Sequence, residues 1–134
     1  MGFLDKYSSQ LLSLLRIVAA LCFMEHGTSK FWHFPMSMGP GELPLIMKAA
    51  GVLEVGGGAL LLLGLFTRPV AFLLSGEMAV AYWMFHAKQG MYPIANMGEA
   101  AVLYCFTFLY LSAAGGGAFA LDNVIGRKRG LDPA

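Results

Sequence analysis

The stretch that decides the fold class is LPLIMKAAGVLEVGGGALLLLGLF, residues 43–66, in which Lys48 and Glu54 are the charged side chains. A helix of about 20 mostly apolar residues is long enough to cross the hydrocarbon core of a bilayer. A carboxyl group such as that of Glu54 is costly inside that core, and such groups usually mark functional sites. The stretch therefore predicts a membrane-spanning helix that carries a buried acid.

Three further apolar stretches, residues 8–27, 70–87 and 97–115, are of similar length, and they carry Glu25, Glu77 and Glu99. The composition agrees with a membrane protein, because 57% of the residues are apolar and 13% are charged. An average soluble domain has about 25% charged residues. We therefore expect an all-α integral membrane protein. Its net charge of +1 predicts no nucleic-acid partner.

Prolines and glycines fall between the four stretches, which predicts short connections and an antiparallel four-helix bundle. The basic residues then divide five to two between the two sides of the membrane. One side holds Lys6, Arg68, Arg127, Lys128 and Arg129, and the other holds Lys30 and Lys88. The positive-inside rule places both termini in the cytoplasm.

These features predict one domain over residues 1–134, with a short basic cytoplasmic tail at residues 122–134. The expected location is the inner membrane of a bacterial cell, crossed several times. The expected partners are the bilayer itself and other copies of the chain.

Three charged residues, Arg16, Glu54 and Glu77, fall near the membrane midplane at a rise of about 1.5 Å per residue. An unpaired guanidinium at that depth would cost several kcal/mol, so we expect Arg16 to pair with Glu54 or with Glu77. Such an ion pair could belong to a ligand site or could simply fix the helix register. The helix face of Arg16 also carries Ala20, Phe23, Gly27 and, if the helix continues, Lys30.

A second group of polar residues lies toward the outer ends of the spans. Histidine changes its charge near neutral pH, and acids and bases gathered in a cleft are candidates for a site. The candidate catalytic residues are Glu54, His86 and Glu99. The candidate ligand-binding residues are Arg16, His26, Lys30, Glu54, Glu77, His86 and Glu99.

The distribution of methionine and histidine raises the possibility of metal binding. Seven of the nine methionines and all three histidines fall in the outer half of the spans and their loops. Thioether and imidazole groups suit Cu(I), so an outward copper site is one alternative. Methionine also fills apolar space adaptably, which explains the same pattern without a metal. The sequence has no E-x-x-H pair of the kind that holds two irons in a helix bundle. No metal ligand is assigned among the candidate site residues.

Several motifs together resemble the DoxX family over nearly the whole chain. The most specific is the block from Glu54-Val55-Gly56-Gly57 to Leu63-Gly64-Leu65-Phe66-Thr67-Arg68. The others are Arg16, His26-Gly27 with Lys30-Phe31, His86, Gly98-Glu99 and the closing Gly117-Ala118-Phe119-Ala120-Leu121-Asp122. The resemblance implies a small four-helix membrane protein, related in fold to membrane subunits of thiosulfate:quinone oxidoreductase. The closing motif often carries serine in the family where this chain has Ala120.

The leading hypothesis is a membrane component of an oxidoreductase system that binds a quinone-like molecule. Arg16, Glu54, His86 and Glu99 would form the polar end of its site, because such groups can hydrogen-bond a quinone carbonyl and supply protons. The electrons would come from a partner oxidoreductase subunit. The alternatives are a carrier or binding protein for a small lipophilic or anionic compound, an intramembrane isomerase, and a copper-binding protein.

Overall fold

The computed structural model describes residues 2–128, and the regular structure in that part of the chain is helical throughout. The helices are α1 (Gly2–Asp5), α2 (Ser8–Trp32), α3 (Leu45–Leu63), α4 (Thr67–Ala81), α5 (Glu99–Ala114) and α6 (Leu121–Lys128). Beyond Ala81, α4 continues into a π-helical turn η1 (Tyr82–His86) and a 3-10 turn η2 (Ala87–Gln89). The all-α prediction is confirmed.

Three helical segments are long and apolar enough to cross a membrane: Ser8–Trp32, Leu45–Leu63 and Thr67–Gln89. The helix α5 is apolar but has only 16 residues. The four stretches predicted to span the membrane correspond to α2, α3, α4 with its η1 and η2 continuation, and α5. The structure thus supplies three helices of spanning length and a shorter fourth.

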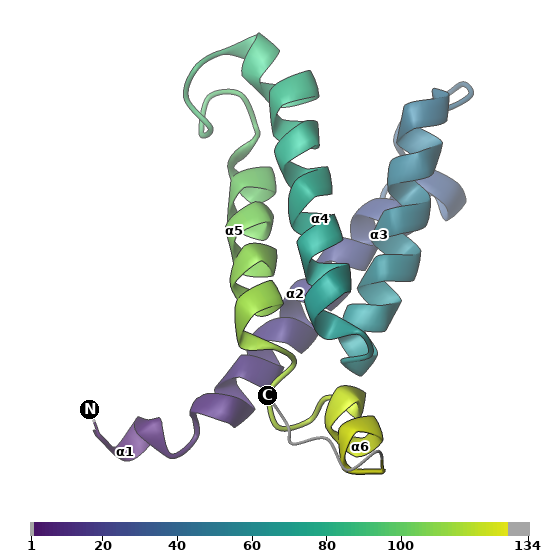
Figure 1. The fold of residues 1–134 in the computed structure, drawn as a ribbon. Helices are drawn as coiled ribbons and strands as arrows, with labels where there is room; N and C mark the ends of the chain where they lie inside the picture. The colour runs from purple at the N-terminus through teal and green to yellow at the C-terminus, as the bar shows by residue number, and fades with distance from the viewer. Residues whose placement is uncertain (1, 129–134) are drawn as a thin grey trace.

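The helices α2 to α5 run alternately in opposite directions (Figure 1). One end of the bundle holds α1, the α3–α4 turn and α6, and we call it the terminal end. The other end holds the connections at residues 33–44 and 90–98, and we call it the loop end. Helix α2 packs on α3, α3 on α4, and α4 on α5.

Helix α2 extends to Trp32, five residues beyond the predicted end at residue 27, because Gly27 is a packing position. A Cβ atom on Gly27 would lie 2.6 Å from Val55 Cγ2 and 2.9 Å from the carbonyl oxygen of Gly51. Small residues allow two helix backbones to approach this closely. The helix ends only at His33, which adopts a left-handed backbone conformation with φ 55°. Lys30 is therefore helical and buried.

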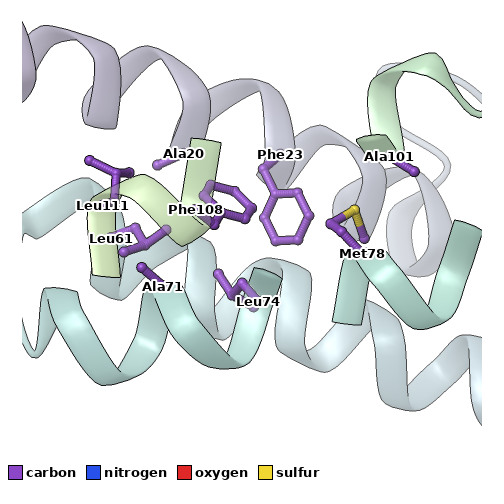
Figure 2. Packing of buried hydrophobic residues seen from close by; sticks show 9 residues of the cluster. All are labelled: Ala20, Phe23, Leu61, Ala71, Leu74, Met78, Ala101, Phe108 and Leu111. Carbon is purple, nitrogen blue, oxygen red and sulfur yellow. The ribbon is translucent and has the colours of Figure 1, made fainter. Parts of the chain in front are cut away.

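The apolar core is narrow and runs along the bundle axis. Figure 2 shows the rings of Phe23 and Phe108 meeting edge to face near its middle, with ring centroids 4.9 Å apart. Around them pack Ala20, Leu61, Ala71, Leu74, Met78, Ala101 and Leu111. Many large apolar side chains point outward instead; Phe72, for example, is 67% exposed and Phe106 is 65% exposed. An apolar outer surface of this extent suits contact with lipid rather than with water.

Candidate functional site

Arg16 is fully buried, and its guanidinium donates hydrogen bonds to backbone carbonyl groups rather than to a carboxylate. The acceptors are the carbonyl oxygens of Leu61, Leu62 at 2.6 Å, Gly116 at 2.8 Å and Phe119 at 3.4 Å. The predicted ion pair with Glu54 or Glu77 is therefore wrong. A guanidinium has five N–H donors, so several carbonyl groups can satisfy it without an acid.

This contact caps the end of α3. The last carbonyl groups of a helix have no partner within the helix, and a cation is favourable beside them. Gly64, with φ 68°, turns the chain so that the Leu65 N–H reaches the Leu60 carbonyl oxygen at 2.9 Å. Arg16 binds the next two carbonyl groups, those of Leu61 and Leu62. Arg16 thus completes the termination of α3.

Asp122 caps the start of α4 in the complementary way. Its carboxylate accepts hydrogen bonds from the backbone N–H groups of Phe66 at 2.7 Å and Thr67 at 2.9 Å. Negative charge is favourable at a helix N-terminus. The α3–α4 turn is therefore held by a cation from α2 on one side and an anion from α6 on the other.

The residues expected to form a cytoplasmic tail partly belong to the fold. Residues 121–128 form α6, and the Asp122 N–H also donates to the Gly64 carbonyl oxygen at 2.9 Å. The side chains of Arg127 and Lys128, and all of Arg129, lie outside the described residues.

Glu54 pairs with Lys30. The Lys30 Nζ atom donates to Glu54 Oε1 at 2.7 Å and to Oε2 at 2.6 Å, and the two side chains are 7% and 5% exposed. This is the one ion pair between side chains of residues 2–126. A charge pair this deeply buried is stable only because both partners are present. The structure thus brings together two of the predicted ligand-binding residues.

Glu77 lies on α4 beside an apolar groove between α3 and α4. The groove has a volume of about 510 Å³ and is lined by Ile46, Ala49, Ala50, Leu53, Phe72, Leu73, Gly76, Glu77, Val80, Ala81 and Phe85. Glu77 is the one ionisable residue in this lining. Both of its carboxyl oxygens are buried, and neither has a hydrogen-bond partner within the described chain. An unpaired polar group in such surroundings is costly, which makes it a candidate for ligand contact.

Glu54 and Glu77 lie opposite each other across the α3–α4 contact. A Cβ atom on Gly57 would lie 2.8 Å from Leu74 Cδ2, which fixes the register of these antiparallel helices. One turn along each helix, the same register places Glu54 level with Glu77. Farther along, it places Ala50 level with Ala81, and both line the groove. The Lys30–Glu54 pair therefore stands next to Glu77.

His86 belongs to a loop network at the loop end. Its Nδ1 atom lies 3.0 Å from the Asn96 carbonyl oxygen, and its ring stacks on Tyr82. The buried Asn96 side chain bonds to the Gly90 carbonyl oxygen and to the Gly98 N–H. These contacts hold the connection at residues 90–98 in place. His86 is not among the residues that line the groove beside Glu77.

The remaining two candidate residues, His26 and Glu99, are exposed. The His26 ring lies against Tyr104, with centroids 5.8 Å apart, and its Nδ1 atom is 3.2 Å from the Cys22 carbonyl oxygen. Glu99 starts α5 directly after Gly98, which packs against His86. Neither residue lines the groove. The predicted site is thus split between the Lys30–Glu54–Glu77 cluster, the capping contacts of Arg16 and the loop end.

No group of three or more His, Cys, Asp or Glu side chains within residues 2–128 is placed to hold a metal ion. The methionine-rich connection has exposed Met36 and Met38 side chains beside His33, whose Nδ1 atom lies 3.2 Å from Ser37 Oγ. Copper binding by thioether and imidazole groups stays a prediction.

The model of the DoxX family matches residues 11–87, which is more than half of the chain. The chain belongs to the DoxX family. Family membership and the three apolar helices of spanning length make this DoxX protein a multi-pass membrane protein. The motifs quoted from the sequence now have structural roles, because Arg16 and Asp122 cap the turn in which the Leu-Gly-Leu-Phe-Thr-Arg block lies.

Three relatives are similar to this DoxX protein over most of its length. An uncharacterized protein of Haemophilus influenzae is 50% identical over 135 residues, covering 96% of this chain and 100% of that protein. The inner membrane protein YqjF of Escherichia coli is 28% identical, covering 84% of this chain and 90% of that protein. An uncharacterized membrane protein of Mycobacterium tuberculosis is 27% identical, covering 85% and 80% respectively. No solved structure matches the chain.

The pairing of Lys30 with Glu54 was missed in the sequence, although a signal for it was present. Lys30 follows Arg16 by 14 residues, about four helical turns, so the two side chains share a face of a continuous helix. The predicted span ended at residue 27, whereas in the structure Gly27 packs closely on α3 and the helix continues to Trp32.

Proposed function

We propose that this DoxX-family protein binds a quinone-like lipophilic molecule in the groove between α3 and α4, as the membrane component of an oxidoreductase system. The observation that carries the proposal concerns Glu77, which lines an otherwise apolar groove of about 510 Å³ and whose buried carboxyl oxygens have no hydrogen-bond partner within the described chain. Ligand pockets are mostly apolar with a few polar groups that fix the orientation of the ligand. This groove has that composition.

The chemistry of Glu77 suits a carbonyl ligand. In apolar surroundings without a partner, a carboxyl group is far more stable as the neutral acid than as the anion. A neutral acid donates one hydrogen bond, and a quinone carbonyl accepts one. When the quinone is reduced, the same acid can pass its proton to the carbonyl oxygen. In this proposal the partner subunit supplies the two electrons, and Glu77 supplies one proton at each transfer to the carbonyl oxygen it then contacts, being reprotonated between the two transfers that form the quinol.

The walls of the groove suit the rest of such a molecule. Phe72 on α4 and Phe85 on η1 offer aromatic surface to a flat ring, and Ile46 and Leu53 on α3 offer aliphatic surface to a chain. Phe72 is 67% exposed, as expected for a side chain at the lipid-facing rim. A hydrophobic ligand can therefore enter sideways from the bilayer.

The proposal includes the membrane topology. We propose four spans, with α5 as the fourth, both termini in the cytoplasm of a bacterial cell with the chain in its inner membrane, and a single domain over the whole chain. Lys6 lies between α1 and α2 and Arg68 lies in the first turn of α4, so both belong to the terminal end and support this orientation. A membrane-impermeant thiol reagent should label a Glu42→Cys variant from outside intact spheroplasts when Cys22 and Cys105 are first replaced by serine. Labelling of the introduced thiol only after lysis would contradict the proposed orientation.

The ligand proposal is tested by changing Glu77. Glu77→Leu should weaken the binding of a short-chain ubiquinone analogue at least tenfold, because it removes the hydrogen bond to the carbonyl, worth about 1.4 kcal/mol. Glu77→Gln keeps an N–H donor and should bind within a few-fold of the unmodified protein. Native mass spectrometry and quenching of the intrinsic tryptophan fluorescence, in mild detergent, measure the binding.

Two further variants separate the groove from other surfaces. A Cβ atom on Gly76 meets no atom within 4 Å, so Gly76→Phe can fill the groove without moving the backbone, and it should block binding. The exposed Glu99 serves as the control, and Glu99→Gln should bind normally. Unchanged affinity in both Glu77→Leu and Gly76→Phe would overturn the proposal. Retention of a different lipophile in the groove would favour a carrier or binding protein instead.

A further inference from the structure

Lys30 lies between two different environments. On one side it lines a cavity of about 180 Å³ at the loop end, together with residues of the connection such as His33, Glu42 and Lys48. On the other side its ammonium group makes two hydrogen bonds with the carboxylate of Glu54. His33, Glu42 and Lys48 are exposed, so the cavity is open to water. Lys30 thus connects a polar cavity at the surface with a buried carboxylate.

Glu54 stands, in turn, next to Glu77. The contact between Gly57 and Leu74 places the two acids level with each other on α3 and α4. Three ionisable side chains from three helices therefore form a row from the loop-end cavity to the apolar groove.

The terminal end offers no comparable row within the described residues. Its buried cation, Arg16, is bound to backbone carbonyl groups, and a guanidinium does not release its proton. On the terminal side of Glu77, helix α4 buries Ala71, Leu74 and Ser75. The titratable group that α5 presents there is Cys105, whose Sγ atom lies 3.6 Å from Ser75 Oγ. An acid–base chain thus leads from Glu77 toward the loop end.

We propose that Glu77 exchanges its proton with the loop-end cavity through Glu54 and Lys30. The Glu54 carboxylate takes a proton from the Lys30 ammonium group and passes it to ionised Glu77, directly or through one water molecule. The neutral Lys30 amine then takes a proton from water in the cavity. After one cycle Lys30 and Glu54 have their original charges, and one proton has moved from the cavity to Glu77.

This inference assigns a proton supply to the groove, and in that sense it rests on the proposed ligand site. A groove molecule that takes up protons on reduction would draw them from the loop-end side of the membrane. The test below contains no groove molecule, so it can succeed or fail independently of quinone binding.

The experiment follows the carboxylic acid of Glu77 by infrared spectroscopy in lipid nanodiscs. After transfer from H2O to D2O, the C=O stretching band of a protonated carboxyl group shifts as its proton is exchanged. The band that is absent in Glu77→Gln belongs to Glu77. We expect the exchange at Glu77 to slow at least tenfold in the double variant Lys30→Met/Glu54→Leu. An apolar pair of similar volume can replace a buried ion pair, so we expect this variant to keep the fold.

The controls are chosen from groups outside the row. Glu25→Gln changes an exposed acid on α2, and Ser75→Ala changes the contact between α4 and α5; both should exchange at the unmodified rate. An unchanged rate in the folded double variant would overturn the proposal. Slow exchange in Ser75→Ala would place the proton route on the α5 side and would contradict a route through Glu54 and Lys30. A spectrum of the unmodified protein without a Glu77 band would also contradict the proposal, because Glu77 would hold no proton to exchange.

Discussion

Replacing Arg16 by methionine is expected to lower the free energy of unfolding by about 3–5 kcal/mol, because hydrogen bonds to a charged group contribute about 1.5–3 kcal/mol each. Methionine fills similar space but leaves the Leu62 carbonyl group without a donor and the Gly116 carbonyl group with the Ser13 hydroxyl alone. The whole stability of a protein is only about 5–15 kcal/mol. We therefore expect most of the Arg16→Met protein to be lost during purification, and thermal unfolding in mild detergent, followed by size-exclusion chromatography, measures the effect.

Arg68 provides the matched control for this change. It also lies at the terminal end and donates to the carbonyl oxygens of Ser112 and Ala113, but those contacts are exposed. Arg68→Met should therefore cost about 1 kcal/mol or less. Arg16→Lys should be intermediate, since one ammonium group cannot reach all the carbonyl groups that Nε, Nη1 and Nη2 of the guanidinium reach. If Arg16→Met unfolds at the temperature of the unmodified protein, the capping role is wrong.

Breaking the Lys30–Glu54 pair is expected to have an effect of similar size. Glu54→Leu leaves a buried ammonium group, and Lys30→Met leaves a buried carboxylate, and each should cost about 3–5 kcal/mol. The double variant Lys30→Met/Glu54→Leu should recover most of that loss, because an apolar pair of similar volume can replace a buried ion pair. A double-mutant cycle on thermal stability measures the coupling.

The cycle has internal controls at the same end of the bundle. Lys48→Met and Glu42→Gln remove exposed charges, so each should change stability by less than about 0.5 kcal/mol. Additive losses in the double variant would mean that Lys30 and Glu54 do not depend on each other. That result would also remove the central link of the proposed proton route.

Much of the bundle could be predicted from periodicity and composition. The predicted stretches match the helices α2 to α5 within a few residues at most ends, since spanning length and the breakers between spans are local properties of the chain. The buried face of α2 was predicted as well: Arg16, Ala20, Phe23, Gly27 and Lys30 are all buried. A rigid helix fixes which side chains share a face, so sequence spacing is sufficient for that.

The pairing of charges could not be predicted in the same way. Equal depth made an Arg16–Glu54 pair look suitable, but depth says nothing about where one helix ends beside another. Arg16 lies beside the last turn of α3, where free carbonyl groups compete with any acid. Lys30, about four turns farther along α2, reaches Glu54 instead.

The sequence by itself determined that this is an all-helical membrane protein, which residues share the face of Arg16 on α2, and that Glu54 and Glu77 lie deep in the apolar region. Those features follow from length, hydropathy and the helical repeat. The tertiary structure alone decided which buried charges are satisfied and by what: Arg16 by carbonyl groups, Glu54 by Lys30, and Glu77 by no group within the described chain. Hydrogen bonds of about 3 Å depend on the register between helices, which packing contacts such as that of Gly57 with Leu74 fix.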